Sequence, residues 1–184
     1  GVETGMRQVG SISVALTAHR HEELLRQATV ARIFDVDVSE ISPTEVKAMY
    51  PHLNVSDVVG AVHLPLDGQC DPGNIALALA KGAKMRGAQI FEHTKVVGVT
   101  KAAGRVSGVD FIDADGEPGR IAADVVVNCG GMWGRDLAEA SGVTLPLHAC
   151  EHFYLITEPI QGLGHMPVLR VPDECAYYKS DAGK

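Results

Sequence analysis

The chain has 184 residues, 46% of them hydrophobic, so it is long enough to bury a sizeable core and is not expected to be disordered. Its 16 basic and 23 acidic residues give a formal net charge of -7 without a Lys/Arg block, which argues against a nucleic-acid or anionic-membrane surface. Four well-separated cysteines, without a C-x-x-C motif, argue against a zinc site and a compact disulfide framework, so we expect reduced thiols and no metal.

The sequence shows neither a transmembrane stretch nor a signal peptide. No stretch approaches the ~20 apolar residues that span a bilayer, and the N-terminus lacks the pattern of a signal peptide. We therefore expect an intracellular protein that is not secreted. Because the sequence starts at Gly1 without a Met and stops at Lys184 directly after a predicted strand, we expect a fragment of a longer protein.

The first elements are predicted by alternation and by helix-capping residues. Residues 11–17 alternate like a strand, and Thr17 is a suitable cap for a helix. Residues 42–45, Ser-Pro-Thr-Glu, form a capping box with proline at the first helical position, which predicts a short helix that Pro51 stops. The apolar face of the first helix is expected to carry Leu24, Leu25, Ala28 and Ala31.

A second strand and helix follow. Residues 60–64 are apolar and predict a strand. Asp71 and Pro72 are a cap and a first-turn proline for a helix of small residues over about 74–86, which Gly87 ends. Such a helix can approach a sheet or a ligand closely.

The middle of the chain predicts β-structure. Residues 89–94 and 96–99 predict a strand with a kink. Residues 105–112 and 119–121 flank the turn 113–116, Asp-Ala-Asp-Gly, and its turn chemistry predicts a hairpin.

The run 123–129 is almost continuously apolar, which predicts a strand buried on both faces of a parallel sheet. It ends in Gly130 and Gly131, and a helix over 133–141 with Gly142 as its stop follows. Glycines at the carboxyl end of a buried strand let a phosphate or sugar approach the backbone, although a tight packing turn would need them too. No G-x-G-x-x-G motif follows a strand.

The last part predicts two strands, 152–157 and 175–179. His152 and Tyr154 are two positions apart and share a face, whereas Tyr177 and Tyr178 point to opposite faces, so at most one of these two can enter a given pocket. For each of these residues a hydrogen-bonded structural role or a place in the core is the alternative.

Six segments together resemble one family, and they cover nearly the whole chain in order. They resemble the dimethylglycine and sarcosine dehydrogenase branch of the D-amino acid oxidase superfamily of FAD-dependent oxidoreductases. The elements Asp-Gly-x-x-Asp-Pro and Asn-x-x-Gly-x-Trp are each only moderately specific, but their order and spacing together are hard to obtain by chance. The segments are residues 41–47, 66–72, 126–133, 151–154, 167–170 and 176–178.

The resemblance implies a mixed α/β and α+β fold, in which part of a Rossmann-type FAD-binding domain is combined with part of an antiparallel-sheet substrate domain. Within a single region over 1–184, residues 11–66 and 147–184 would belong to the substrate domain and residues 67–146 to the FAD domain. The loop from Asp67 to Pro72 would lie close to the flavin.

The resemblance also implies site residues. The family's catalytic histidine corresponds to His152, and its active-site tyrosine to Tyr178, with Tyr177 as the second choice. The adenine would be held by backbone groups at Val96. The other residues beside the cofactor would be Cys129, Gly130, Gly131 and Trp133. The partner of the substrate carboxylate stays open between Arg170 and Arg32.

The activity implied is oxidation of the C–N bond of an N-methylated glycine-type amine, dimethylglycine or sarcosine, by hydride transfer to FAD. Oxygen or an electron-transfer flavoprotein would accept the electrons, and tetrahydrofolate would bind in a further C-terminal domain. The protein would be cytoplasmic in a bacterium or reside in the mitochondrial matrix of a eukaryote. Two alternatives stay open: a related FAD oxidoreductase acting on another amine, proline, an opine or glycerol phosphate, and a truncated non-catalytic domain.

The family's N-terminal glycine fingerprint and covalent-flavin histidine would precede Gly1, and a second glycine-rich cofactor segment would follow Lys184. The isolated chain is therefore expected to bind FAD poorly.

Overall fold

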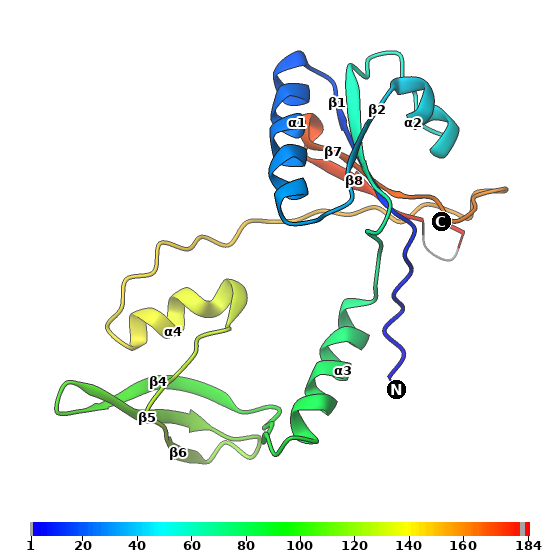
Figure 1. The fold of residues 1–184 in the computed structure, drawn as a ribbon. Helices are drawn as coiled ribbons and strands as arrows, with labels where there is room; N and C mark the ends of the chain where they lie inside the picture. Colours follow the sequence, from blue (N-terminus) through cyan, green and yellow to red (C-terminus); the bar gives the residue numbers. More distant parts are fainter. Residues whose placement is uncertain (1, 181–182) are drawn as a thin grey trace. The chain divides into compact units, whose positions relative to one another are not determined.

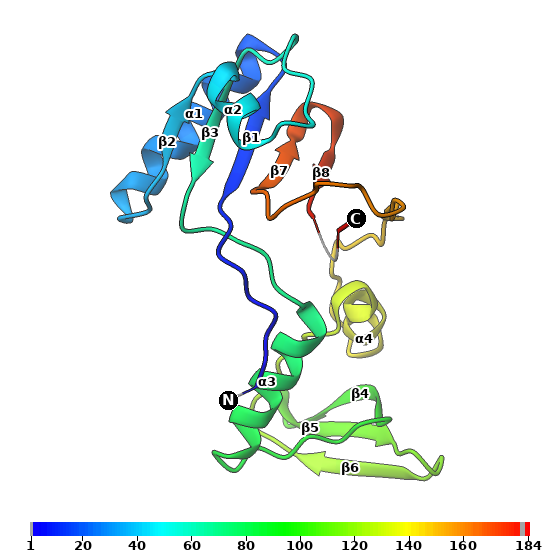
Figure 2. The same cartoon turned by 90° about the vertical axis from the view of Figure 1, so that its right-hand side faces the viewer.

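The computed structural model describes residues 2–180 and 183–184, and the chain divides into two compact units. Unit 1 comprises Gly1–Ala83 and Leu155–Lys184, and unit 2 comprises Lys84–Tyr154. Figures 1 and 2 show the course of the chain from two directions. Each unit has its own sheet and is described by itself.

Unit 1 is built on a five-stranded sheet with the order β2-β3-β1-β7-β8. The central strand β1 runs antiparallel to β3 and parallel to β7, and both outer pairs, β2-β3 and β7-β8, are antiparallel. The elements are β1 (Ser11–Ala15), α1 (Ala18–Ile33), β2 (Ser39–Ile41), α2 (Pro43–Met49), β3 (Gly60–Leu64), α3 (Pro72–Lys84), β7 (Val168–Val171), η2 (Pro172–Glu174) and β8 (Ala176–Tyr178).

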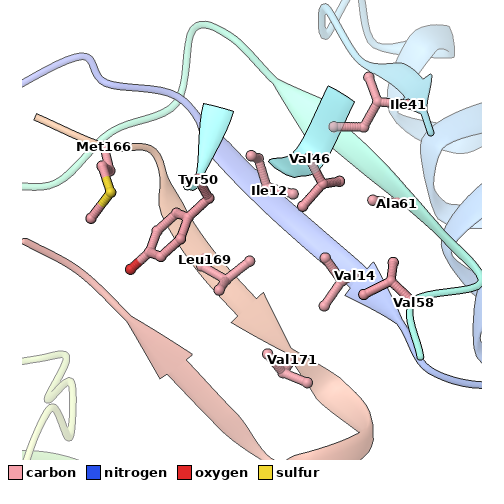
Figure 3. Close-up of a cluster of buried hydrophobic side chains, with 10 residues drawn as sticks. All are labelled: Ile12, Val14, Ile41, Val46, Tyr50, Val58, Ala61, Met166, Leu169 and Val171. Atoms are coloured by element: carbon pink, nitrogen blue, oxygen red, sulfur yellow. The ribbon is translucent and has the colours of Figure 1, made fainter. Parts of the chain in front are cut away.

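Each face of this sheet packs against one helix. Neighbouring residues of a strand point to opposite faces, so Val14 and Ala15 of β1 enter different clusters. On one face, α1 contributes Leu24 and Ala28 to the cluster around Ala15. The other face packs against α2, as Figure 3 shows, through Ile12, Val14, Ile41, Val46, Tyr50, Val58, Ala61, Met166, Leu169 and Val171.

The predicted helix caps of unit 1 are confirmed. The Thr17 side chain accepts a hydrogen bond from the amide of Arg20 at 3.1 Å. In the capping box, the Ser42 amide donates to Glu45 Oε2 at 2.7 Å, and the Glu45 amide donates to Ser42 Oγ at 3.3 Å. The Ser42 hydroxyl also donates to Glu45 Oε2 at 2.7 Å, and the bonds that the Ser42 amide and hydroxyl make to this carboxylate hold the pKa of Glu45 below its ordinary value.

Unit 2 is built on a three-stranded antiparallel sheet with the order β4-β5-β6. The predicted hairpin about residues 113–116 joins β5 to β6, while an unpredicted turn with positive φ at Ala103 and Gly104 joins β4 to β5. Helix α4 packs against β4. The elements are β4 (Lys95–Ala102), β5 (Arg105–Ile112), β6 (Pro118–Ala122), η1 (Gly131–Trp133) and α4 (Gly134–Ala140).

Three strand predictions are wrong. Residues 89–94, 123–129 and 152–157 form no strand. An apolar run becomes a strand only when a neighbouring strand takes its backbone hydrogen bonds in a ladder, and no described strand forms a ladder with these segments. The run 123–129 continues β6 by one backbone bond, in which the Ala123 amide donates to the Ser107 carbonyl of β5 at 3.2 Å. Val125 and Val127 are each 76% exposed, whereas the prediction placed them in a buried sheet.

The predicted mixed fold is confirmed, with one sheet that combines parallel and antiparallel pairs and a second that is antiparallel. The assignment of residues 11–66 and 147–184 to a substrate domain, and of 67–146 to an FAD domain, stays a prediction. In the described part of the chain, no helix combines the length and the apolar character needed to span a bilayer.

Candidate functional site

The glycine turn before α4 is held by the asparagine of the Asn-x-x-Gly-x-Trp element, which the sequence analysis did not predict as a site residue. Asn128 Oδ1 accepts a hydrogen bond from the Gly130 amide at 3.0 Å, and Asn128 Nδ2 donates to the Gly134 carbonyl at 2.8 Å. The asparagine thus connects the end of the apolar run to the first turn of α4. An asparagine two residues before a glycine is a known turn signal that could have identified it.

The two glycines have different surroundings. A Cβ on Gly130 would lie 3.0 Å from Asn128 Oδ1, so the turn is tight on that side. Gly131 has a φ of +53°, and no heavy atom lies within 4 Å of the position that its Cβ would take. Trp133, two residues further along the chain, is 68% exposed. This turn leaves room for a flat polar group to approach the backbone, which fits a flavin nucleotide.

Val96 lies in the same unit as this turn. It is on β4 opposite Phe111 of β5. The same strand is tied to the end of α4, because the Val99 amide donates to Ser141 Oγ at 3.3 Å and Lys101 Nζ donates to the Ser141 carbonyl at 2.8 Å. Unit 2 therefore contains both the predicted adenine contact and residues 129–133, and these bonds join β4 to the C-terminal end of α4.

The Asp-Gly element after β3 is anchored to the strand β1. Asp67 Oδ2 accepts a hydrogen bond from Ser11 Oγ at 2.7 Å, and the Gly10 amide donates to the Asp67 carbonyl at 2.8 Å. A Cβ on Gly68 would lie 2.1 Å from the Arg7 carbonyl oxygen. The glycine is therefore required by close backbone packing, apart from any contact with a cofactor.

The two candidate tyrosines occupy opposite faces of the unit 1 sheet, as predicted. Tyr177 pairs with Arg170 across β7 and β8, whereas Tyr178 pairs with Leu169. Leu169 belongs to the cluster that contains Tyr50. Burial raises the pKa of Tyr50 and the nearby Tyr178 raises it further, so these two phenols lie on one face.

His152 is exposed and lies in unit 2, in a segment without regular structure. Tyr154, predicted to share its face, is 83% exposed. The β8 tyrosines belong to unit 1, so the histidine and the phenols are defined within separate units. Their joint action stays a prediction.

The two candidate arginines differ in their location and in their hydrogen bonds. Arg32 Nε, at the end of α1, donates to the Val38 carbonyl at 3.1 Å and so fixes the chain after the helix. Arg170 is an exposed residue of β7 that pairs with Ser13 on one side and Tyr177 on the other. These three polar residues form a row on one face of the sheet.

Unit 1 also contains an open cavity of about 410 Å³ between α1, β2 and the start of α2. His21 Nε2 lies 3.1 Å from Glu40 Oε1 at its edge. The imidazole packs directly on Gly60, where a Cβ would lie 2.4 Å from Nε2. None of the predicted site residues lines this cavity.

Comparison with known proteins places the chain in a family. The model of the FAD dependent oxidoreductase family (DAO) matches residues 1–183. The human mitochondrial sarcosine dehydrogenase is 35% identical over 184 residues, which cover 97% of this chain and 20% of that protein. The 4-methylaminobutanoate oxidase (formaldehyde-forming) of Paenarthrobacter nicotinovorans is 36% identical over 185 residues, covering 100% of this chain and 22% of that protein.

A third relative is named as a regulatory protein. The mitochondrial pyruvate dehydrogenase phosphatase regulatory subunit of Mus musculus is 38% identical over 161 residues, covering 86% of this chain and 18% of that protein. The chain therefore spans about a fifth of the length of the curated relatives it matches.

The fold has a counterpart among solved structures. The L-proline dehydrogenase from P. horikoshii superposes with a TM-score of 0.77 at 24% identity, over 98% of this chain and 48% of that one. That likeness concerns the fold, and the family match extends over nearly every residue. The chain belongs to the FAD dependent oxidoreductase (DAO) family.

Proposed function

We propose that the full-length protein containing this chain is a flavin-dependent amine dehydrogenase or oxidase. Its substrate would be an N-methylated glycine-type amine, dimethylglycine or sarcosine, oxidised at the C–N bond. The observation that carries the proposal is the similarity to sarcosine dehydrogenase over almost the whole chain. A second relative is named as an oxidase of a methylamino acid that forms formaldehyde, which is consistent with loss of an N-methyl group.

Bound FAD would supply the hydride acceptor. This chain would contribute part of the surface that holds the cofactor. The open backbone at Gly131, fixed by Asn128, would face the nucleotide, and Val96 would contact the adenine. Cys129, Gly130 and the exposed Trp133 would line the same surface.

The proposed roles of the substrate-binding residues follow from the protonation state of the amine. Oxidation requires the neutral amine, because its lone pair must assist loss of hydride. His152 and Tyr178 would orient the amine and accept or relay its ammonium proton. Tyr177 is the second choice for the phenol.

The strand register links the choice of tyrosine to the choice of arginine. Arg170 shares a face with Tyr177, so a carboxylate bound at Arg170 would favour Tyr177 as the neighbouring phenol. Tyr178 lies instead on the face of Leu169 and Tyr50. Arg32 is the weaker candidate for the carboxylate because its guanidinium already binds the Val38 carbonyl.

The test mixes the full-length protein anaerobically with dimethylglycine, sarcosine, unmethylated glycine, proline or glycerol phosphate, each in a separate sample. Flavin absorbance near ~450 nm reports reduction of the cofactor. We expect the methylated amines to bleach the flavin and glycine to leave it oxidised. Bleaching by proline or glycerol phosphate alone would contradict the substrate class. Admitting air afterwards separates an oxidase, which produces hydrogen peroxide, from a dehydrogenase that needs a flavoprotein acceptor.

A second candidate function is a non-catalytic regulatory role, and the similarity to the phosphatase regulatory subunit favours it. It predicts a folded full-length protein whose flavin, if bound, is not reduced by any of these amines. Dithionite reduction provides the control, because it shows that the flavin itself can still accept electrons.

A further inference from the structure

The connection between β7 and β8 carries an acid that is bound by the start of α1. Asp173 Oδ2 accepts a hydrogen bond from the Leu16 amide at 2.9 Å, and Oδ1 lies 3.4 Å from both Thr17 Oγ1 and Arg20 Nε. Two of these donors belong to the turn that leads from β1 into α1. One carboxylate therefore joins two parts of unit 1 that are 157 positions apart in sequence.

The strand that follows this connection lies at the edge of the unit 1 sheet. β8 has three residues, lies at the edge of the sheet and pairs only with β7 among the described strands. Cys175, between η2 and β8, adopts a left-handed backbone conformation with a φ of +53°, which side-chain-bearing residues adopt only when their surroundings hold them. The direction in which β8 leaves the turn therefore depends on how firmly η2 is held.

The charge of Asp173 suits this task. The Leu16 amide lowers its pKa most, and the contacts with Arg20 and Thr17 lower it further against the opposing effect of burial. A carboxylate can accept from several donors at once, which a neutral side chain of the same size does less well. Arg20 also pairs with Glu23, so its charge is shared between two acids.

We propose that Asp173 is a positioning residue, which fixes the β7-β8 hairpin on the β1-α1 junction and thereby sets the orientation of Tyr177 and Tyr178. The effect on catalysis rests on the function proposed above. The effect on the hairpin does not, so the two can be tested apart.

The experiment compares three variants of the full-length protein: Asp173→Ala, Asp173→Asn and, as a matched control, Glu174→Ala. Glu174 lies on the same connection, and its side chain makes no hydrogen bond or ion pair within the described part of the chain. Amide hydrogen exchange over residues 168–178 reports on the hairpin, and the limiting rate of anaerobic flavin reduction per bound FAD reports on the tyrosines.

We expect amide exchange in Asp173→Ala to be about tenfold faster than in the unchanged protein. Its limiting reduction rate should fall by about tenfold while the dissociation constant of the amine changes less, because alignment of a reacting group acts on the chemical step. Asn retains one acceptor for the Leu16 amide but loses the charge and the second acceptor, so both properties should lie between those of Asp173→Ala and of the unchanged protein. The Glu174→Ala variant should match the unchanged protein.

Unchanged exchange in Asp173→Ala would overturn the proposal. So would faster exchange with an unchanged reduction rate per bound flavin, which would mark a purely structural contact. If Asp173→Ala does not fold, Arg20→Met is tested in its place, because it removes only the bond from Arg20 Nε to Asp173. An amide exchange rate in Arg20→Met equal to that of the unchanged protein would then contradict the proposal. If amines fail to reduce even the unchanged protein, the proposed function falls, and the exchange data alone decide whether Asp173 holds the hairpin.

Discussion

At the scale of single residues, unit 1 depends on a few side chains that are almost fully removed from water. Ile12, Val14, Val46 and Leu169 are the largest of them, and three of these lie on neighbouring strands. Leu169 of β7 sits between Ile12 of β1 and Tyr178 of β8. Its packing therefore affects both the central strand and the strand with the candidate tyrosines.

Replacing Leu169 by alanine should lower the free energy of unfolding by about 2–5 kcal/mol, because apolar area is lost and a cavity is left. Urea denaturation followed by circular dichroism measures the change. Ile33→Ala is the matched control. Ile33 is 74% exposed at the end of α1, so its replacement should lower the free energy of unfolding far less. Equal losses would show that Leu169 does not pack as described.

Tyr50 makes stability sensitive to alkaline pH. Its folded-state pKa lies above the ordinary value of 10.0, chiefly through burial. A raised pKa means that this stabilisation is complete below the pKa of the unfolded chain and is lost as the pH rises through the folded value. We expect the melting temperature to fall more steeply above about pH 10 in the unchanged protein than in Tyr50→Phe. Parallel curves would contradict this.

The two tyrosines of β8 can be distinguished by separate phenylalanine substitutions in the full-length protein. Tyr178→Phe should lower the rate of flavin reduction by dimethylglycine on the order of 10²-fold, the usual effect of losing a proton-transfer group. Tyr177→Phe is expected to stay within a few fold of the unchanged protein. The reverse result would assign the phenol to the face of Arg170.

At the scale of elements, local signals predicted the helices well and the strands unevenly. Thr17 and Ser42 cap their helices because the capping bond is made within three residues, where sequence and geometry coincide. The run 123–129 has the composition of a buried strand, but pairing partners are set by distant parts of a chain. The β4-β5 turn was missed because Ala103 adopts a positive φ that alanine seldom takes.

In the candidate site too, the features set by local sequence were predicted and those set by contacts between side chains were not. The glycines after residue 128 were recognisable as a turn, while the bonds of Asn128 to Gly130 and Gly134 are evident only in the folded structure. The opposite faces of Tyr177 and Tyr178 followed from strand alternation alone. The contacts of Asp173 with the β1-α1 junction could not be predicted, because no local pattern encodes a bond over 157 positions.

In the sheet of unit 2, Gly108 is required by the approach of β6. Its φ is +154°, and a Cβ would lie 2.1 Å from the Ile121 carbonyl oxygen. Gly108→Ala should therefore destabilise the sheet by more than about 2 kcal/mol, because backbone atoms must move apart. Gly98→Ala on β4 is the control, since its Cβ would have no neighbour within 4 Å. Chemical denaturation measures the stability of both variants. Equal stability of Gly108→Ala and Gly98→Ala would show that position 108 does not require glycine.

At the scale of the whole molecule, the chain exposes a large apolar surface for its size. Val125, Val127, Phe153 and Leu155 are each at least 76% exposed. Exposed apolar side chains of this size favour association with other apolar groups.

The 184-residue segment produced alone should therefore bind the dye ANS and self-associate. The double change Val125→Ser and Val127→Ser should lower both the dye fluorescence and the light scattering. A matched pair on the polar surface, Lys84→Ser and Lys95→Ser, should leave both signals high. If the valine changes leave dye binding unaltered, the apolar surface that binds the dye does not include Val125 and Val127.

The parallel pairing of β1 with β7 also has a consequence for biosynthesis. A ribosome adds about 5–20 residues per second, so on the order of ten seconds pass between translation of Leu16 and of Asp173, which are 157 positions apart. Throughout that interval the β7 edge of β1 has no partner, whereas the hairpins of unit 2 can close as soon as they emerge. A nascent chain stalled near residue 150 would therefore present a bare strand edge to chaperones, and release of β7 from the exit tunnel is the event that closes it.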